Sequence, residues 1–176
     1  MTLQPLSGAA ARFCDAVDRL NNVMGRVWGL TIIFVTFAVL YEVVARGLFG
    51  QATLWANETT VYLSAMAYLI AGGYALQRRM HVRIDVLYLQ FSRRGQFRAD
   101  IFGFVFFFLY VATLIWVGGE SAWTSFLQGE TTGTPWNPPI WPVKVAIPLA
   151  GVLLLLQGIA NILRDLSASQ EKAASR

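Results

Sequence analysis

Apolar residues fall into four long stretches along the chain, separated by short polar segments. A helix needs about 20 mostly apolar residues to cross the hydrocarbon core of a bilayer. Each stretch approaches that length, so the pattern predicts four transmembrane helices and an all-α membrane protein. The spans use most of the chain, and residues 1–176 are expected to form one membrane domain. The expected spans cover roughly residues 27–46, 57–77, 100–120 and 140–163.

The segment before the first span mixes apolar and charged residues at helical spacing, which predicts an amphipathic helix over residues 12–26. Two placements are open at this point. The helix lies in the membrane interface, or it extends the first span beyond the membrane. Its apolar positions are Phe13, Val17, Leu20, Met24 and Val27.

Two further segments flank the remaining spans. After the second span, Asp85 is placed to cap a short interfacial helix over residues 85–95, and Gly95 is expected to end it. Residues 166–176 are mostly small and polar, with little apolar surface to bury, and predict a disordered tail.

Composition and charge agree with a membrane protein of defined orientation. Mean hydropathy is +0.51 and 56% of the residues are hydrophobic, which is high for a soluble domain of this size. The net charge is +4, and no nucleic-acid-binding motif accompanies the basic residues, so no nucleic acid partner is expected. The positive-inside rule places both termini and the middle loop in the cytoplasm. The basic residues that decide this are Arg12, Arg19, Arg26, Arg78, Arg79, Arg83, Arg93, Arg94, Arg98, Arg164, Lys172 and Arg176.

One face of the second span combines an acid, aromatic rings and small residues at steps of three and four. An acid inside the membrane should face protein, and small residues let two backbones approach. The face therefore predicts contact with another protein helix. Its members are Trp55, Glu58, Tyr62, Ala65, Leu69 and Gly72.

Charged residues from all four spans are expected near the outer membrane surface. Glu42 and Arg46 are four residues apart in the favourable order for a helical ion pair. Two interpretations are open: the charges only pair with one another, or some form part of a landing surface for a partner. Stiff prolines and the anchoring rings of Trp136 and Trp141 mark the last outer loop. The outer charges are Glu42, Arg46, Glu58, Glu120 and Lys144.

The residue types that most enzyme chemistry needs are scarce. His81 is the only histidine and Cys14 the only cysteine, so one chain cannot supply bis-histidine haem ligation or a thiol pair. Zinc motifs are missing as well. The sequence therefore predicts no catalytic residues, no metal and no cofactor, and His81 is expected to make a structural, lipid-headgroup or partner contact.

The order of these features resembles the small membrane subunit, DctQ-type, of the tripartite ATP-independent periplasmic (TRAP) transporters. The resemblance lies in the ARGLFG end of the first span, the WxxE opening of the second, the AGG that follows and HVRID after it. It covers residues 27–165. Its sharpest positions are Arg46, Trp55, Glu58, His81 and Asp85.

The resemblance implies a set of partners in the bacterial inner membrane. A large membrane subunit carries the substrate with sodium, and a periplasmic substrate-binding protein delivers it. The small subunit packs on the large one, among membrane lipids, as a non-catalytic scaffold. The last third is similar to members that serve small organic acids. The alternative is an independent membrane assembly factor, or a cofactor-free subunit of a membrane enzyme.

The arginine distribution predicts the topology directly. Cysteines introduced as Gln51→Cys and Gly133→Cys should react with a membrane-impermeant thiol reagent added to the periplasmic side. A cysteine introduced as Gln96→Cys should react only after the membrane is permeabilised. The reverse labelling pattern would invert the orientation.

Overall fold

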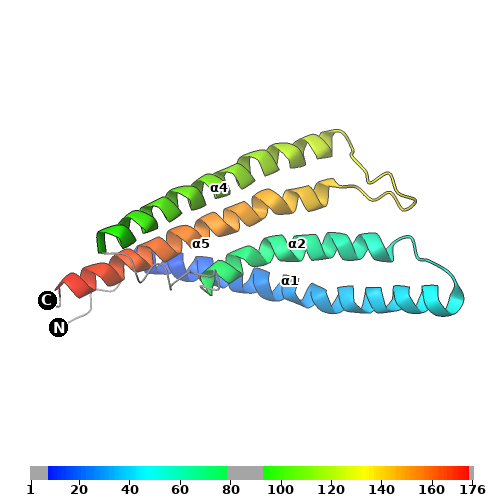
Figure 1. Ribbon diagram of the computed structural model, residues 1–176, viewed down its shortest axis with the longest axis horizontal. Helices are drawn as coiled ribbons and strands as arrows, with labels where there is room; N and C mark the ends of the chain where they lie inside the picture. The colour runs from blue at the N-terminus through cyan, green and yellow to red at the C-terminus, as the bar shows by residue number, and fades with distance from the viewer. Residues whose placement is uncertain (1–7, 79–92, 175–176) are drawn as a thin grey trace.

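The computed structural model describes residues 8–78 and 93–174. The described residues are built from helices, and each helix contains an apolar window long enough to cross a membrane. The predicted all-α architecture with four spans is therefore confirmed (Figure 1). The helices are α1 (Gly8–Phe49), α2 (Ala56–Gln77), α4 (Arg93–Leu127) and α5 (Trp141–Ala174).

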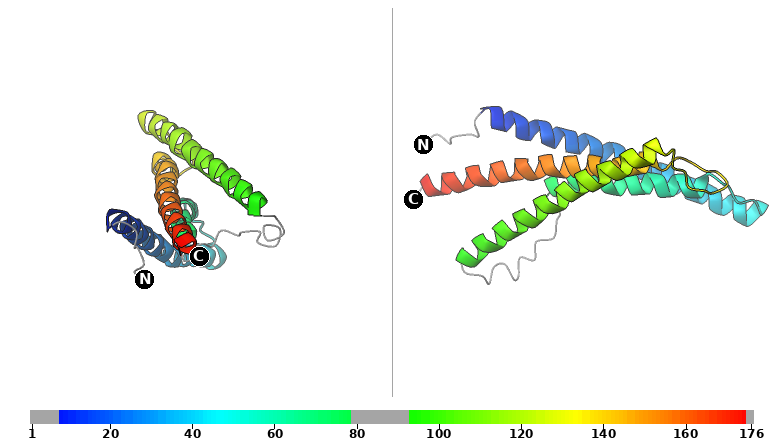
Figure 2. Two further views of the ribbon diagram at one scale, coloured as in Figure 1. Left: turned by 90° about the vertical axis from the view of Figure 1, so that its left-hand side faces the viewer. Right: turned by 90° about the horizontal axis from the view of Figure 1, so that it is seen from above.

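Helix α5 holds the bundle together because it packs against all three other helices. The chain forms one antiparallel pair from α1 and α2 and another from α4 and α5. The start of α1 and the end of α5 lie at the same end of the molecule, opposite the α1–α2 and α4–α5 connections (Figure 1). Seen from above, α4 crosses α5 near the loops and diverges towards its own N-terminus (Figure 2).

Residues 12–26 are helical, as expected, and form part of the continuous helix α1. Cys14 and Val17 of this segment pack on α5 at Ala160, while Leu20 and Val27 are exposed. Its placement in the membrane interface stays a prediction. At 1.5 Å per residue, the 42 residues of α1 are about 63 Å long. That is about twice the thickness of the hydrocarbon core.

Two predicted boundaries differ from the structure. Helix α4 already begins at Arg93, so Gly95 continues a helix instead of ending one. The rest of the predicted 85–95 helix lies outside the described residues. Helix α5 continues to Ala174, where a disordered tail was expected from residue 166. Alanine, glutamate, glutamine and lysine in this segment are good helix formers, and no glycine or proline interrupts them.

Glycines allow α4 and α5 to pack closely. A Cβ added at Gly118 would lie 2.7 Å from Ile147 Cγ2 and 3.3 Å from Pro148 Cδ. On the facing helix, a Cβ at Gly151 would lie 2.8 Å from Ile115 Cγ1. Membrane helices associate through such small residues because van der Waals packing replaces the hydrophobic drive that water would supply.

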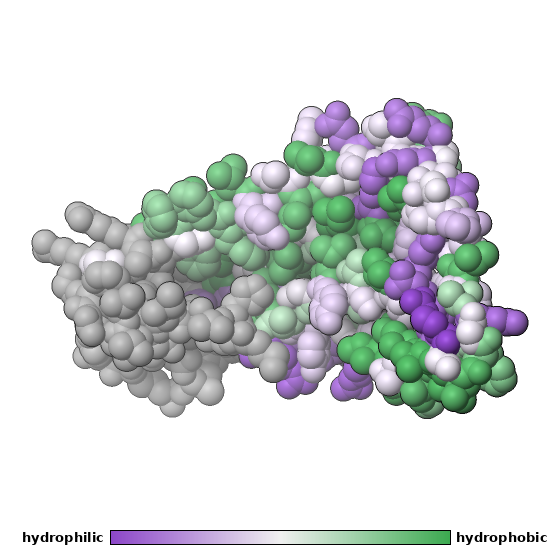
Figure 3. Space-filling view, turned by 45° about the vertical axis from the view of Figure 1, so that its right-hand side comes forward, coloured by the Kyte–Doolittle hydropathy of each residue, from purple (hydrophilic) through white to green (hydrophobic). Residues whose placement is uncertain are grey.

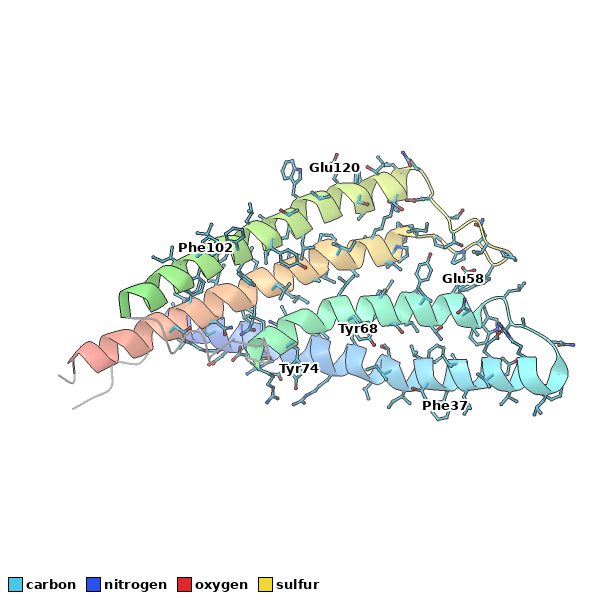
Figure 4. The ribbon with its side chains drawn as sticks, viewed as in Figure 1. Phe37, Glu58, Tyr68, Tyr74, Phe102 and Glu120 are labelled. Atoms are coloured by element: carbon cyan, nitrogen blue, oxygen red, sulfur yellow. The ribbon has the colours of Figure 1, made fainter. Side chains whose placement is uncertain are left out.

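The outer faces of the helices are strongly apolar. Phe37 on α1 is 66% exposed and Phe102 on α4 is 65% exposed, and both point away from the bundle (Figure 4). Apolar atoms cover the middle of the molecule, while polar atoms gather at the end that carries the α1–α2 and α4–α5 loops (Figure 3). This distribution suits a bundle surrounded by lipid or by another membrane subunit.

The glycine contacts predict an asymmetric response at two neighbouring positions. Gly118→Ala should lower the free energy of unfolding by about 1–3 kcal/mol, because the methyl group meets Ile147 and Pro148. Gly119→Ala is the matched control, since a Cβ there meets nothing within 4 Å. It should be neutral or slightly stabilising, because alanine favours helix over glycine. Unfolding in detergent micelles measures both, and equal effects would contradict the packing.

Candidate functional site

Glu42 closes the loop between α1 and α2. One carboxylate oxygen accepts a hydrogen bond from Arg46 Nη2 at 2.6 Å, which confirms the predicted ion pair. The other oxygen accepts the backbone N–H of Thr53 at 3.0 Å and the hydroxyl of the same residue. Gly50 ends α1 with a positive φ of 65°, a conformation that glycine adopts without steric cost. The loop that leads to α2 is therefore held by its own side chains.

Trp55 adds an aromatic contact to this loop. Its ring stacks on Tyr41 of α1, with ring centroids 6.0 Å apart. Trp55 remains 40% exposed, while Tyr62 on the next turns of α2 is half-buried. The stack fixes the beginning of α2 beside α1 at the loop end of the molecule.

The loop between α4 and α5 is a short, folded hairpin. Ile140 N–H donates to Glu130 O at 2.9 Å, and Thr132 N–H donates to Pro138 O at 3.2 Å. At its tip, Asn137 has a positive φ of 53°, and its side-chain oxygen accepts the Gly133 N–H at 2.9 Å. The prolines restrict the backbone further. The loop is therefore stiff.

Two polar contacts tie this hairpin to the helices. Lys144 on α5 donates to the Glu130 carboxylate at 2.5 Å. The Thr132 hydroxyl donates to Glu58 Oε2 on α2 at 3.3 Å, which links the two helix pairs. The hydrogen bond from Lys144 holds the pKa of Glu130 below its usual value. Glu130 is therefore ionised at neutral pH, and the pair persists there.

The remaining predicted outer residues lie in different places. Trp141 packs edge-to-face on Phe126 at 5.6 Å and anchors the start of α5. Trp136, in the hairpin, is 43% exposed. Glu120 is exposed on α4, on the side away from the other helices, so it does not join the outer group (Figure 4). His81 and Asp85 lie outside the described residues.

The mixed face of α2 meets a helix of the same chain. At its outer end, Glu58 is bonded to the hairpin, and at its inner end Gly72 faces α5, where a Cβ would lie 3.8 Å from Leu154. Gly72 therefore has a helix partner within the subunit, whereas Glu58 is bonded to a loop. Contact of this face with a second subunit stays a prediction.

A polar cluster at the opposite end joins α1 to α5, and sequence reasoning missed it. Gln157 is fully buried; its Oε1 accepts Asn21 Nδ2 at 2.8 Å, and its Nε2 donates to Asp18 Oδ1 at 3.0 Å. Arg164 donates to the other oxygen of Asp18 at 2.6 Å. Asn161 Nδ2 reaches the Leu76 carbonyl of α2 at 3.4 Å.

A sequence signal for this cluster exists, although it is incomplete. Gln157, Asn161 and Arg164 follow one another at steps of four and three, on one face of an otherwise apolar span. Asp18 and Asn21 are likewise three residues apart. The spacing predicts two polar stripes, but only the fold shows that they face each other.

These observations define a multi-pass membrane protein. Hydrogen bonds and ion pairs hold the loops at one end of the bundle, and a polar cluster joins the helices near the other end. In the described part of the chain, no three His, Cys, Asp or Glu side chains are grouped so that they could hold a metal ion. Residues 35–168 match the family described as Tripartite ATP-independent periplasmic transporters, DctQ component. The chain therefore belongs to the DctQ family and is the small membrane subunit of a TRAP transporter. No curated protein matches it.

The polar cluster predicts energetic coupling between α1 and α5. Asn21→Ala and Gln157→Leu should each cost about 1–3 kcal/mol, because each leaves a buried polar group without its partner. The double variant should cost at least about 0.5 kcal/mol less than the sum. Asn22→Ala is the control, since the Asn22 side chain bonds only locally to the Asp18 carbonyl in the described structure. Additive effects for Asn21 and Gln157 would contradict the coupling.

Proposed function

We propose that this chain is a non-catalytic scaffold subunit that packs on the large transport subunit of a sodium-coupled TRAP transporter for small organic acids. The transporter lies in the bacterial inner membrane, with both termini of this chain in the cytoplasm. The small subunit enlarges the static part of the complex and helps to dock the periplasmic substrate-binding protein. Membership of the DctQ family supports a role alongside other TRAP subunits.

The observation that carries the scaffold role is the amount of apolar surface left open by the bundle. Helix α4 exposes aromatic rings along much of its length, including Phe102, Phe106 and Trp116, the last at 77%. Helix α1 exposes a second apolar face, which includes Phe37 and points away from the bundle (Figure 4). Two such faces suit a subunit with lipid on one side and a larger membrane protein on the other.

The docking role rests on the hairpin between α4 and α5. Its ends are held by the Glu130–Lys144 pair and by the Thr132–Glu58 bond, while Trp136 stays exposed. A segment that is already ordered loses little conformational entropy when a partner binds. Docking of a delivery protein has to be transient, which suits a small interface. Charges around the hairpin would chiefly speed association and make it salt-sensitive.

Reconstitution tests the scaffold role. The chain should copurify with a large membrane subunit, and the complete set of subunits in liposomes should import an organic acid under a sodium gradient. The small subunit alone should give no uptake. Sodium-dependent uptake by the small subunit alone would overturn the proposal, as would a fully active transporter without it.

The hairpin predicts a defect that extra binding protein can repair. Trp136→Ala should raise the concentration of binding protein needed for half-maximal uptake several-fold, with little loss at saturation, because aromatic anchors often dominate an interface. Leu54→Ala is the control, since it removes an exposed apolar side chain from the α1–α2 loop at the same end of the molecule. An unchanged Trp136→Ala titration curve in an intact complex would leave the hairpin without a docking role.

A further inference from the structure

Two arginines lie where the α1–α2 pair leaves the membrane at its inner end. About 20 residues separate Arg26 from Arg46, and the helix rises about 30 Å between them. The two side chains therefore belong near opposite boundaries of the hydrocarbon core. Arg78 follows the last residue of α2, whose final turns pack against α1 at Gly25, next to Arg26 in the chain. Both arginines are exposed.

Tyr74 fixes the geometry of this seam between α1 and α2. Its ring lies against the α1 backbone at Gly25, where an added Cβ would be 2.6 Å from the ring Cγ. Arg78 Cζ lies 5.2 Å from the centroid of the same ring, in a cation–π contact. Arg26 directly follows Gly25, and long helical side chains lean towards the N-terminus of their helix. Tyr74, labelled in Figure 4, therefore links the two arginines: Arg78 lies over its ring, and Arg26 is the next residue after the glycine against which the ring packs.

An apolar stripe continues from Arg26 towards the membrane centre. Leu30, Ile33 and Phe37 follow it at steps of four, three and four, so the four residues share one face of α1. The side chains of Leu30, Ile33 and Phe37 are 65%, 55% and 66% exposed. A positive end at the membrane boundary followed by an open apolar face matches the two parts of a phospholipid.

We propose that Arg26 and Arg78 bind the phosphate-bearing headgroup of an anionic phospholipid, whose acyl chain lies along Leu30, Ile33 and Phe37. Guanidinium groups bind phosphate oxygens with paired, charge-assisted hydrogen bonds. A headgroup with net negative charge fits two neighbouring arginines better than a zwitterionic one, because the latter adds an ammonium group. The assignment is the same whichever side of the membrane this end faces.

Native mass spectrometry of the full-length chain, released from detergent with phosphatidylglycerol and phosphatidylcholine, tests the site. Wild type should retain phosphatidylglycerol preferentially. In the Arg26→Gln, Arg78→Gln double variant, affinity for this lipid should fall about 30-fold, which corresponds to about 1 kcal/mol for each arginine. In the single Arg26→Gln variant, at an exposed position, the affinity for phosphatidylglycerol should fall about fivefold. This variant repeats the test with a milder change.

The matched control is an Arg12→Gln, Arg19→Gln double variant, which removes the same charge from exposed positions nearer the N-terminus of α1. Its affinity for phosphatidylglycerol should stay within about twofold of wild type, because the site needs local guanidinium groups and not general positive charge. A large excess of inorganic phosphate should leave the lipid bound, since it has no acyl chain. Equal loss in the control, no preference for the anionic lipid, or displacement by phosphate would each overturn the site.

Discussion

The buried amide of Gln157 is the interaction on which the arrangement of α1 and α5 depends. It accepts from Asn21 and donates to Asp18, whose carboxylate is also bonded to Arg164. A buried polar group costs free energy unless it finds its partners. Rotating α1 or sliding it by one turn would break all of these bonds together. The cluster therefore fixes the register of the two helices, which apolar packing alone would leave loosely defined.

Close backbone contacts then build the other sides of the bundle around α5. Gly118 and Gly151 bring α4 onto one side, and on another side Gly73 of α2 packs near Leu153. The same glycine lies against Asn21, so the polar cluster and the small-residue contacts meet at one point of the structure. Since α5 participates in all of these contacts, the positions of the other helices are coupled through it.

The fixed bundle determines what the two ends of the molecule present. At the loop end, the Thr132–Glu58 bond joins the α4–α5 hairpin to α2, and Lys144 holds the hairpin against α5. At the other end, Tyr74 packs on Gly25 and holds Arg78 beside α1. Both ends therefore combine a rigid base with exposed groups, which is what the proposed scaffold role and the proposed lipid site require.

The sequence alone determined the features that depend on neighbouring residues. Four apolar stretches defined the spans, the four-residue spacing defined the Glu42–Arg46 pair, and short motifs indicated the DctQ family. Helical periodicity also identified faces, but it cannot say what each face meets. Only the tertiary structure decided that residues 12–26 pack on α5, that Lys144 pairs with Glu130, and that Gln157 reaches α1. These contacts join residues far apart in the chain, and their geometry depends on helix crossing and register, which local spacing does not encode.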